Sequence, residues 1–410
     1  MADNGSPRII IAGAGIAGLA AGLAFAARGH EVRIFERAHE LGEVGAGLQL
    51  SPNATRILAR LGVLPGLLSA AVRPLAVVLR DAAALAELAR VPLGETGERR
   101  WQAPYLALHR ADLQSALAAR VAAEPMIELV TGAEIRGMKM VGSGVCAAVE
   151  THGGPQPVGG RLLVGADGVW STLRGLSGAA GRSRFSGDVA WRRTVGADSP
   201  EGRILNLLGA AEVVTAVLSP DLHIVIYPLR GGTMFNLAAF TAGPDLANSW
   251  TERPDRRLLE GAMLRVAPAL AGLAADAADW TAWPIHTVDP EHPWTAPGLA
   301  LIGDAAHAMT PFAAQGAAMA IEDADTLAAH VSARPHDLSR ALAGWEAERR
   351  PRIRRVARRG ALNRRAWHAS GPVAFARNLF LRLRGPEQLA ADLDWLYGWE
   401  PAPPEHRPPA

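Results

Sequence analysis

A glycine-rich turn near the N-terminus has the residue types and the spacing that bind a dinucleotide. Gly13, Gly15 and Gly18 stand between a short apolar run and an apolar segment of helical length. Glycines at these positions permit a tight turn and let the backbone approach a pyrophosphate, which the N-terminus of the next helix stabilises. Glu36 follows Gly18 by 18 residues, and its carboxylate can accept hydrogen bonds from an adenosine ribose. The pattern therefore predicts a dinucleotide site.

Two acidic turns come later in the chain, each after an apolar run. Gly165–Arg174 reads GADGVWSTLR, and Gly303–Gly316 reads GDAAHAMTPFAAQG. Asp304, at the end of its predicted strand, can accept a hydrogen bond from a ligand hydroxyl, and the helix beginning near Gly316 directs its positive end toward the same region. Taken alone, either turn also fits an ordinary acidic turn after a buried strand.

A short alternating segment offers side chains for a substrate. Leu222–Tyr227 alternates apolar and polar residues, which places His223 and Tyr227 on one face of a strand, four residues apart. A surface histidine beside a structural tyrosine is the alternative interpretation. Pro311 has no N–H, so its carbonyl is the group that it can offer to a ligand.

In this order the three glycine- and aspartate-containing motifs resemble the three fingerprints of the class A flavoprotein monooxygenases. This is the family of para-hydroxybenzoate hydroxylase, salicylate hydroxylase and 3-hydroxybenzoate 6-hydroxylase. The resemblance extends over nearly the whole chain. It includes a loop near the flavin, a segment whose arginine contacts FAD, the end of a substrate-domain strand and a C-terminal motif, which correspond here to Gly45–Asn53, His109–Leu113, Tyr227–Gly232 and Asp394–Gly398.

The resemblance implies a set of residues that bind FAD without a covalent bond. The residues are Gly13, Gly15, Ile16, Ala17, Gly18, Glu36, Arg37, Gly47, Arg110, Asp167, Asp304, Gly316 and Ala317. Asp167 would also serve the fold and the passage of NAD(P)H.

The resemblance also suggests catalytic candidates, namely His223, Tyr227, Gln49 and Pro311. The 3-hydroxybenzoate enzyme has a histidine and a tyrosine at the spacing of the first two. Some pyridine-hydroxylating relatives place a histidine base where this chain has Gln49, and the 3-hydroxybenzoate enzyme has a glutamine in place of Pro311. The identity of the base and the position hydroxylated therefore stay open.

A family member of this kind would use NADH or NADPH as a transient reductant and O2 as the oxidant. A flavin C4a-hydroperoxide would then hydroxylate a small phenolic or heteroaromatic ring, expected to carry a carboxylate. The chain has no second nucleotide-binding motif, which agrees with a reductant that visits only briefly. Arg192 could pair with the carboxylate, although an exposed arginine is the more common explanation.

The order of the segments predicts an α/β fold with two intimately packed parts. A Rossmann-like FAD-binding domain with a parallel sheet is expected in residues 1–183, with some strands near 72–105 belonging to the second part. A mostly antiparallel substrate-binding sheet is expected in 184–285. The FAD-binding domain is then completed in 286–400 together with C-terminal helices, and 401–410 is expected to be a flexible tail.

Composition excludes several other classes of protein. Cys146 is the single cysteine, so neither a disulfide reductase nor a multi-cysteine metal site is possible, and a reducing compartment, the cytoplasm, is expected. Ile9–Ala26 is apolar, but its glycines and the lack of a cationic flank argue against a signal peptide or a membrane span. The arginine run Arg349–Arg365 is interpreted as a solvated helix face rather than a nucleic-acid site, since no aromatic residues accompany it.

Some alternatives within the same superfamily stay open. A flavin halogenase would need a lysine near the substrate, and the single lysine, Lys139, lies outside the expected sheet. An epoxidase, a quinone-ring hydroxylase, and an uncoupled NAD(P)H oxidase or binding protein are all compatible with the three motifs. His307 is given no metal or catalytic role, and a homodimer is compatible with the sequence.

Overall fold

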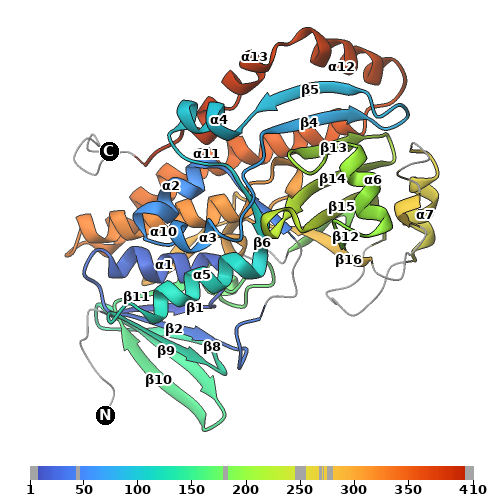
Figure 1. Cartoon of the computed structure of the whole chain (residues 1–410). Helices are drawn as coiled ribbons and strands as arrows, with labels where there is room; N and C mark the ends of the chain where they lie inside the picture. Colours follow the sequence, from blue (N-terminus) through green and yellow to red (C-terminus); the bar gives the residue numbers. More distant parts are fainter. Residues whose placement is uncertain are drawn as a thin grey trace.

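A computed structural model of the chain describes residues 8–42, 47–178, 183–244, 255–266, 270, 272–274 and 280–401. Part of the predicted flavin loop, residues 43–46, and most of the predicted tail, residues 402–410, lie outside the described residues. Figure 1 shows one sheet with its helices beside a second, larger sheet, with the C-terminal helices lying across both.

The first sheet has six strands and is mostly parallel. Its strands in spatial order are β17 (Thr295–Ala296), β18 (Leu299–Leu301), β11 (Leu162–Gly165), β1 (Ile9–Ala12), β2 (Val32–Glu36) and β7 (Ile127–Thr131), of which only β17 pairs antiparallel. The helices α1 (Ile16–Ala26), α5 (Arg110–Ala122) and α10 (Gly316–Ala333) pack beside it. Strands from three distant parts of the chain thus bring the three motifs to one edge of the sheet.

The second sheet has seven strands. In spatial order they are β16 (Thr281–Thr287), β12 (Arg184–Gly196), β15 (Met234–Ala242), β14 (Leu222–Leu229), β13 (Val214–Leu218), β4 (Ala76–Asp81) and β5 (Glu87–Pro92), antiparallel except for β13 with β4. Most of these strands lie in the sequence between β11 and β18. The predicted fold class, a parallel sheet with an inserted and mostly antiparallel one, is confirmed.

The remaining elements cover or connect the two sheets. Two short sheets are formed by β3 (Gly47–Leu50) with β6 (Leu106–His109), and by β8 (Ala133–Val141), β9 (Gly144–Thr151) and β10 (Gly154–Gly160). The smaller helices are α2 (Pro52–Arg60), α3 (Leu64–Leu67), α4 (Gly94–Trp101), α6 (Pro200–Leu207), α7 (Arg257–Met263) and α9 (Asp304–His307). None of the described helices is long and apolar enough to cross a membrane.

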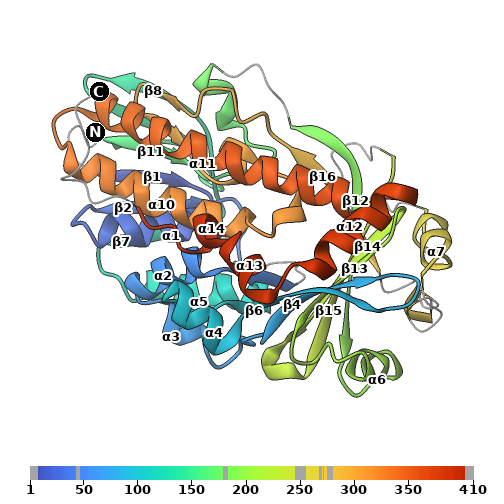
Figure 2. The same cartoon turned by 90° about the horizontal axis from the view of Figure 1, so that it is seen from above.

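The C-terminal region is helical, as predicted. It comprises α11 (Leu338–Trp367), α12 (Gly371–Leu383), α13 (Pro386–Ala391) and α14 (Asp394–Tyr397). Figure 2 shows α11 passing from the side of the six-stranded sheet to the seven-stranded sheet. The interpretation of Arg349–Arg365 as a solvated face is wrong for the first turn of that run, because Arg349 is fully buried and Arg352 is buried as well.

Candidate active site

The first glycine turn packs so tightly that side chains are excluded from it. Gly13 has φ +102°, and a Cβ on it would lie 2.6 Å from the carbonyl oxygen of Ala166 in the second motif. A Cβ on Gly18 would lie 1.9 Å from the carbonyl oxygen of Gly13. Gly15, in contrast, has no atom within 4 Å of its Cβ position and lines a cavity. The turn is therefore closed on the protein side and open where a pyrophosphate would approach, which fits a dinucleotide.

Glu36 ends β2 beside this turn. One carboxylate oxygen, Oε2, accepts a hydrogen bond from the amide of Ala14 at 2.8 Å, and Oε1 accepts one from the amide of Ala38 at 2.9 Å. Arg37 follows it and is exposed. These contacts place the carboxylate at the edge of the glycine turn, where a ribose next to the pyrophosphate would lie.

The second motif is tied to the third by a buried arginine. Arg174 is 2% exposed, and its Nε donates to the carbonyl of Ala305 at 2.8 Å while Nη2 donates to that of Val169 at 2.9 Å. Asp167 Oδ2 accepts from the amide of Thr172 at 2.9 Å, so this carboxylate fixes the turn of its own motif. Arg174 was part of the sequence motif, but its role as a link could not be inferred from its position alone.

The third motif carries a carboxylate and a helix N-terminus into the cavity. Asp304 is the first residue of α9, shortly after the end of β18, and its side chain is exposed. It lines the cavity together with Gly316 and Ala317 at the start of α10. The amide of Gly303 donates to Asp323 Oδ2 at 3.0 Å, and this hydrogen bond connects the turn to α10. Pro311 also lines the cavity, and its carbonyl accepts from the amide of Ala314 at 2.8 Å within its own turn, which leaves one lone pair of that oxygen for a ligand.

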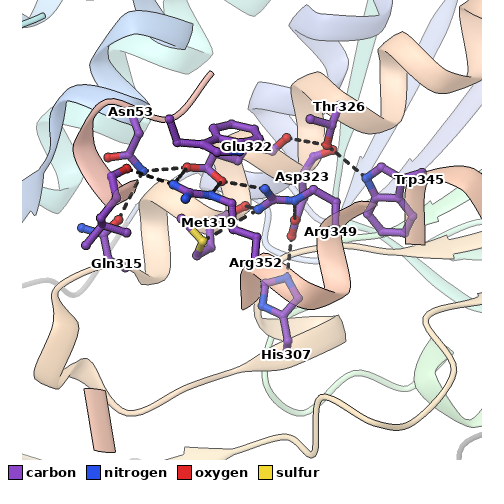
Figure 3. A network of polar contacts seen from close by, with 12 residues as sticks. Asn53, His307, Gln315, Met319, Glu322, Asp323, Thr326, Trp345, Arg349 and Arg352 are labelled. Atoms are coloured by element: carbon purple, nitrogen blue, oxygen red, sulfur yellow. Dashed lines mark hydrogen bonds and ion pairs between the residues drawn. The ribbon is translucent and has the colours of Figure 1, made fainter. Parts of the chain in front are cut away.

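A buried network of charges supports this motif from behind (Figure 3). Glu322 and Asp323 on α10 are both 0% exposed, and Arg349 on α11, also 0% exposed, donates to Glu322 Oε2 at 2.6 Å and to Asp323 Oδ1 at 2.8 Å. Arg352 adds a bond to Glu322 at 2.7 Å. Burial alone would raise the pKa of Asp323, but the neighbouring His307 and Arg349 outweigh it and hold that pKa below its ordinary value.

The same network explains His307. Its Nε2 lies 2.6 Å from Asp323 Oδ2 in the buried interior, so it is a structural partner of that carboxylate. Asn53 Nδ2 reaches Glu322 Oε1 at 2.7 Å, and Gln315 Nε2 donates to Ser51 Oγ at 2.9 Å. The described part of the chain contains no cluster of histidine, cysteine and acidic side chains that could hold a metal ion.

A cavity of about 500 Å³ lies between the two sheets, and both predicted FAD-binding residues and predicted catalytic residues line it. The predicted residues that line it are Gly15, Ile16, Ala17, Gly47, Gln49, Arg110, His223, Tyr227, Asp304, Pro311, Gly316 and Ala317. Gly13, Gly18 and Asp167 instead shape the turns behind the wall, while Glu36 and Arg37 lie farther along the strand edge.

His223 lies on the second sheet, on the wall opposite the first motif. Leu222, Ile224 and Ile226 alternate with it and are buried in the sheet's apolar core, as the alternation predicted. The imidazole is 1% exposed and stacks on Phe240, with ring centroids 4.4 Å apart and an interplanar angle of 7°. Burial holds the pKa of His223 well below its ordinary value, so the ring is neutral near pH 7.

All three tyrosines of the chain line this cavity, although only one was predicted to do so. Tyr105 Oη donates to Gln49 Oε1 at 2.6 Å, and the ring of Tyr397 lies 5.9 Å from that of Tyr105. Burial raises the pKa of Tyr227, and it raises the pKa of Tyr397 to about 12, so these phenols stay protonated. With three tyrosines in 410 residues, their number was the one sequence signal that could have singled out Tyr105 and Tyr397.

The cavity wall contains polar and charged groups. Asn236 Oδ1 accepts from the amide of Gly47 at 2.7 Å, but its buried Nδ2 has no hydrogen-bond partner among the described residues. The charged residues of the lining are Arg110, Arg192, Arg359 and Asp304, an excess of positive charge that favours an anionic ligand. The sequence suggested Arg192 but gave no reason to select Arg359 from the arginine run.

Comparisons with known proteins agree with this geometry. Residues 7–360 match the family described as "FAD binding domain". The 3-hydroxybenzoate 6-hydroxylase of Polaromonas naphthalenivorans is 31% identical over 97% of this chain and 98% of that protein. A 3-amino-4-hydroxybenzoate 2-monooxygenase of Streptomyces platensis is 33% identical over 98% of both chains. Among solved structures, a salicylate hydroxylase–substrate complex shares the fold with a TM-score of 0.79 at 22% identity, covering 96% of each chain.

Proposed function

The chain belongs to the class A FAD-dependent monooxygenases and is an aromatic hydroxylase of that family, and from this premise we propose that its substrate is a small phenol carrying a carboxylate. The observation that carries the proposal is the composition of the cavity. Its lining combines a dinucleotide cradle with His223, three neutral phenols and an excess of arginine.

The residues present fit FAD. Side chains are excluded on the protein side of the glycine turn, and the backbone around Gly15 is open to the cavity. We propose that Glu36 and Arg37 bind the adenosine end, that Arg110 and Asp304 contact the middle of the cofactor, and that Gly47, Gly316 and Ala317 approach its ring. When bound, FAD accepts a hydride from NAD(P)H and activates O2 for transfer of one oxygen atom to the ring.

The protein has its own tasks in this reaction. His223 is proposed to accept the proton of the substrate's ring hydroxyl, because a neutral buried imidazole has a lone pair to offer. Tyr227, and Gln49 held by Tyr105, are proposed to hydrogen-bond the oxygen atoms of the substrate. Phe240, Phe312 and Trp367 exclude water from the same wall.

Arg359 is proposed to bind the substrate carboxylate. Its guanidinium lines the cavity, and within the described residues it has no ion pair, while its charge is close enough to Tyr397 to oppose the rise of that tyrosine's pKa. A carboxylate that enters the cavity would provide the missing anionic partner. Pro311 is proposed to shape the wall beside the reacting ring.

The test is NADH and NADPH oxidation by the purified holoenzyme with 3-hydroxybenzoate, salicylate, 3-amino-4-hydroxybenzoate and 6-hydroxynicotinate. Benzoate is the matched control that lacks a ring hydroxyl. We expect one phenolic acid to raise the slow basal rate by at least about tenfold, with hydroxylated product in equal amount. Stimulation with hydrogen peroxide but without product would contradict the substrate assignment, and a flat response to all four compounds would favour an epoxidase or a quinone-ring hydroxylase.

Three finer properties concern the domains, the compartment and the assembly of the protein. We propose that residues 1–183, apart from strands near 72–105, form the FAD-binding domain together with residues 286–400, and that residues 184–285 with those strands form the substrate domain. We also propose that the protein works in the cytoplasm and that it forms a homodimer. Exposed apolar side chains on α12, including Phe375 and Phe380, support self-association. Light scattering of the purified holoenzyme tests the last point, since a monomeric mass would contradict it.

A further inference from the structure

His223 has a second histidine as its partner. Its Nδ1 lies 2.8 Å from Nε2 of His368, which follows the last residue of α11. At this distance one ring nitrogen donates its hydrogen and the other accepts it. The contact leaves Nε2 of His223 for the cavity that the ring lines.

The two histidines differ in their access to water. His223 is 1% exposed and is enclosed by Phe240, by Phe312 at 5.2 Å and by Trp367 at 5.0 Å between ring centroids. His368 is only partly buried. The pair therefore spans the apolar wall of the cavity, with one imidazole inside it and the other at its outer side.

A proton accepted by His223 cannot stay there. A charged imidazole in this apolar enclosure is strongly disfavoured, and the direction of its pKa shift expresses the same penalty. With a substrate in the cavity, the buried side chain has no contact of its own with bulk water. The neighbouring ring nitrogen of His368 is the route that the geometry offers.

We infer that His223 and His368 form a proton relay that carries the proton of the substrate's ring hydroxyl from the cavity to solvent, an inference that rests on the proposed hydroxylase function. The hydroxyl proton passes to Nε2 of His223, the proton on Nδ1 of His223 passes to Nε2 of His368, and the proton on Nδ1 of His368 passes to water. Passage in the opposite direction protonates the product and restores both rings to their first tautomers. His368 acts through His223 and is not itself in contact with the substrate.

The surroundings of His368 suit a group that is charged only briefly. The negative end of α11 and the nearby Asp188 and Asp221 favour the charged ring, whereas Arg364 opposes it. Arg364 and Asp188 are paired at 2.7 Å, so their charges largely offset each other. Arg377 of α12 donates to the carbonyls of Ala366 and Trp367 at the end of α11, and this adds a further positive charge. Burial outweighs the two carboxylates and lowers the pKa of His368, which favours release of the proton to solvent.

The test measures the proton itself. Holoenzyme is mixed anaerobically with the phenolic acid that stimulates it most, in weakly buffered solution with a pH indicator dye, so that release is followed without turnover. We expect rapid release in the wild type and release slowed by about tenfold or more in His368→Phe and His368→Gln. Glutamine can still hydrogen-bond His223 but cannot relay its proton. In His368→Ala, added imidazole should restore the rate.

His336→Ala is the matched control, because His336 is exposed in the turn between α10 and α11. Retained flavin absorbance shows that each variant is folded. A wild-type rate in both His368→Phe and His368→Gln, or hydroxylation by the wild type without proton release at any pH, would overturn the relay alone. A holoenzyme that binds no phenol would instead overturn the proposed function and the relay with it.

Discussion

The protonation state of His223 decides at which pH the proposed base can act. An imidazole accepts a proton only when it is neutral, and burial shifts the pKa of His223 downward from the ordinary value of 6.5. A lowered pKa means that the ring stays neutral as the pH falls below 6.5 and becomes charged only when the pH passes the depressed value.

We therefore expect the acid limb of kcat/KM to lie below pH 6.5, not at it. His223→Gln should lower kcat by about 100-fold and flatten that limb, because glutamine can bond the substrate but cannot accept its proton. A pH profile of kcat/KM for both proteins checks this. An unchanged acid limb in the variant would assign it to another group.

The proposed role of Arg359 in binding the substrate carboxylate can be tested by replacing this side chain. Replacing Arg359 with methionine removes the proposed partner of the carboxylate while keeping the length of the side chain. A charge-assisted bond of this kind contributes about 1.5–3 kcal/mol, so KM for the carboxylated substrate should rise by roughly ten- to hundredfold with kcat largely kept. Arg358→Met, at an exposed position on the same helix, is the control. An equal effect on the corresponding phenol without a carboxylate would contradict the assignment.

The packing of α10 against α11 depends on a buried network of charged side chains that the sequence alone did not predict. Arg349→Met would leave Glu322 and Asp323 buried without their main partner. Removing one member of a buried ion pair typically costs about 3–5 kcal/mol, so the variant should melt well below the wild type and bind FAD poorly.

Arg354, on the same helix as Arg349, provides the matched control variant. It pairs with Glu291 at the surface, where the ion pair is exposed to solvent. Arg354→Met should therefore leave the melting temperature close to that of the wild type. Thermal unfolding followed by circular dichroism gives the melting temperature of both variants. An equal decrease in the two would contradict a larger contribution of the buried network to stability.

The same elements show what the sequence could and could not predict. Strand, turn and helix are contiguous around Gly15, so local spacing predicted the glycine turn there. The role of Asp304 followed only from the order of the three motifs and stays a prediction. The alternation around His223 predicted its face correctly, because the period of a strand is a local property. Tyr105, Arg359 and Tyr397 were not predicted, since only tertiary packing of distant segments brings them to the cavity. The contact of His368 with His223 was missed for the same reason.

The prediction that the arginine run is a solvated helix face was wrong at Arg349 for a related reason. A helix rich in arginine is normally solvated on its polar face, and nothing local distinguishes Arg349 from its exposed neighbours. Its burial depends on Glu322 and Asp323, which lie on another helix 26 residues or more away in the sequence. Pairing of two buried carboxylates with two arginines is a property of the packed helices and not of either one.

At the scale of the whole molecule, the lining of the cavity comes from the seven-stranded sheet, from the turns that follow strands of the six-stranded sheet, and from α10, α11 and α14. A ligand that fills it binds the folded protein only and stabilises it by mass action. With FAD at about 1,000 times its Kd, this linkage adds about 4 kcal/mol to the free energy of unfolding. Removal of FAD should thus lower the melting temperature by several degrees, and added FAD should restore it.

The position of the cavity makes this expectation more specific. Because its walls belong to both sheets, loss of FAD should loosen the seven-stranded sheet as well as the glycine turn of the first. Hydrogen exchange of the apoprotein and the holoenzyme should then differ in β14 and β15 as much as around Gly13–Gly18. Adenosine diphosphate, which resembles only one end of the cofactor, is the control and should protect the first sheet alone. Equal melting of apoprotein and holoenzyme, or protection by FAD confined to the first sheet, would mean that the two sheets are stable without the cofactor between them.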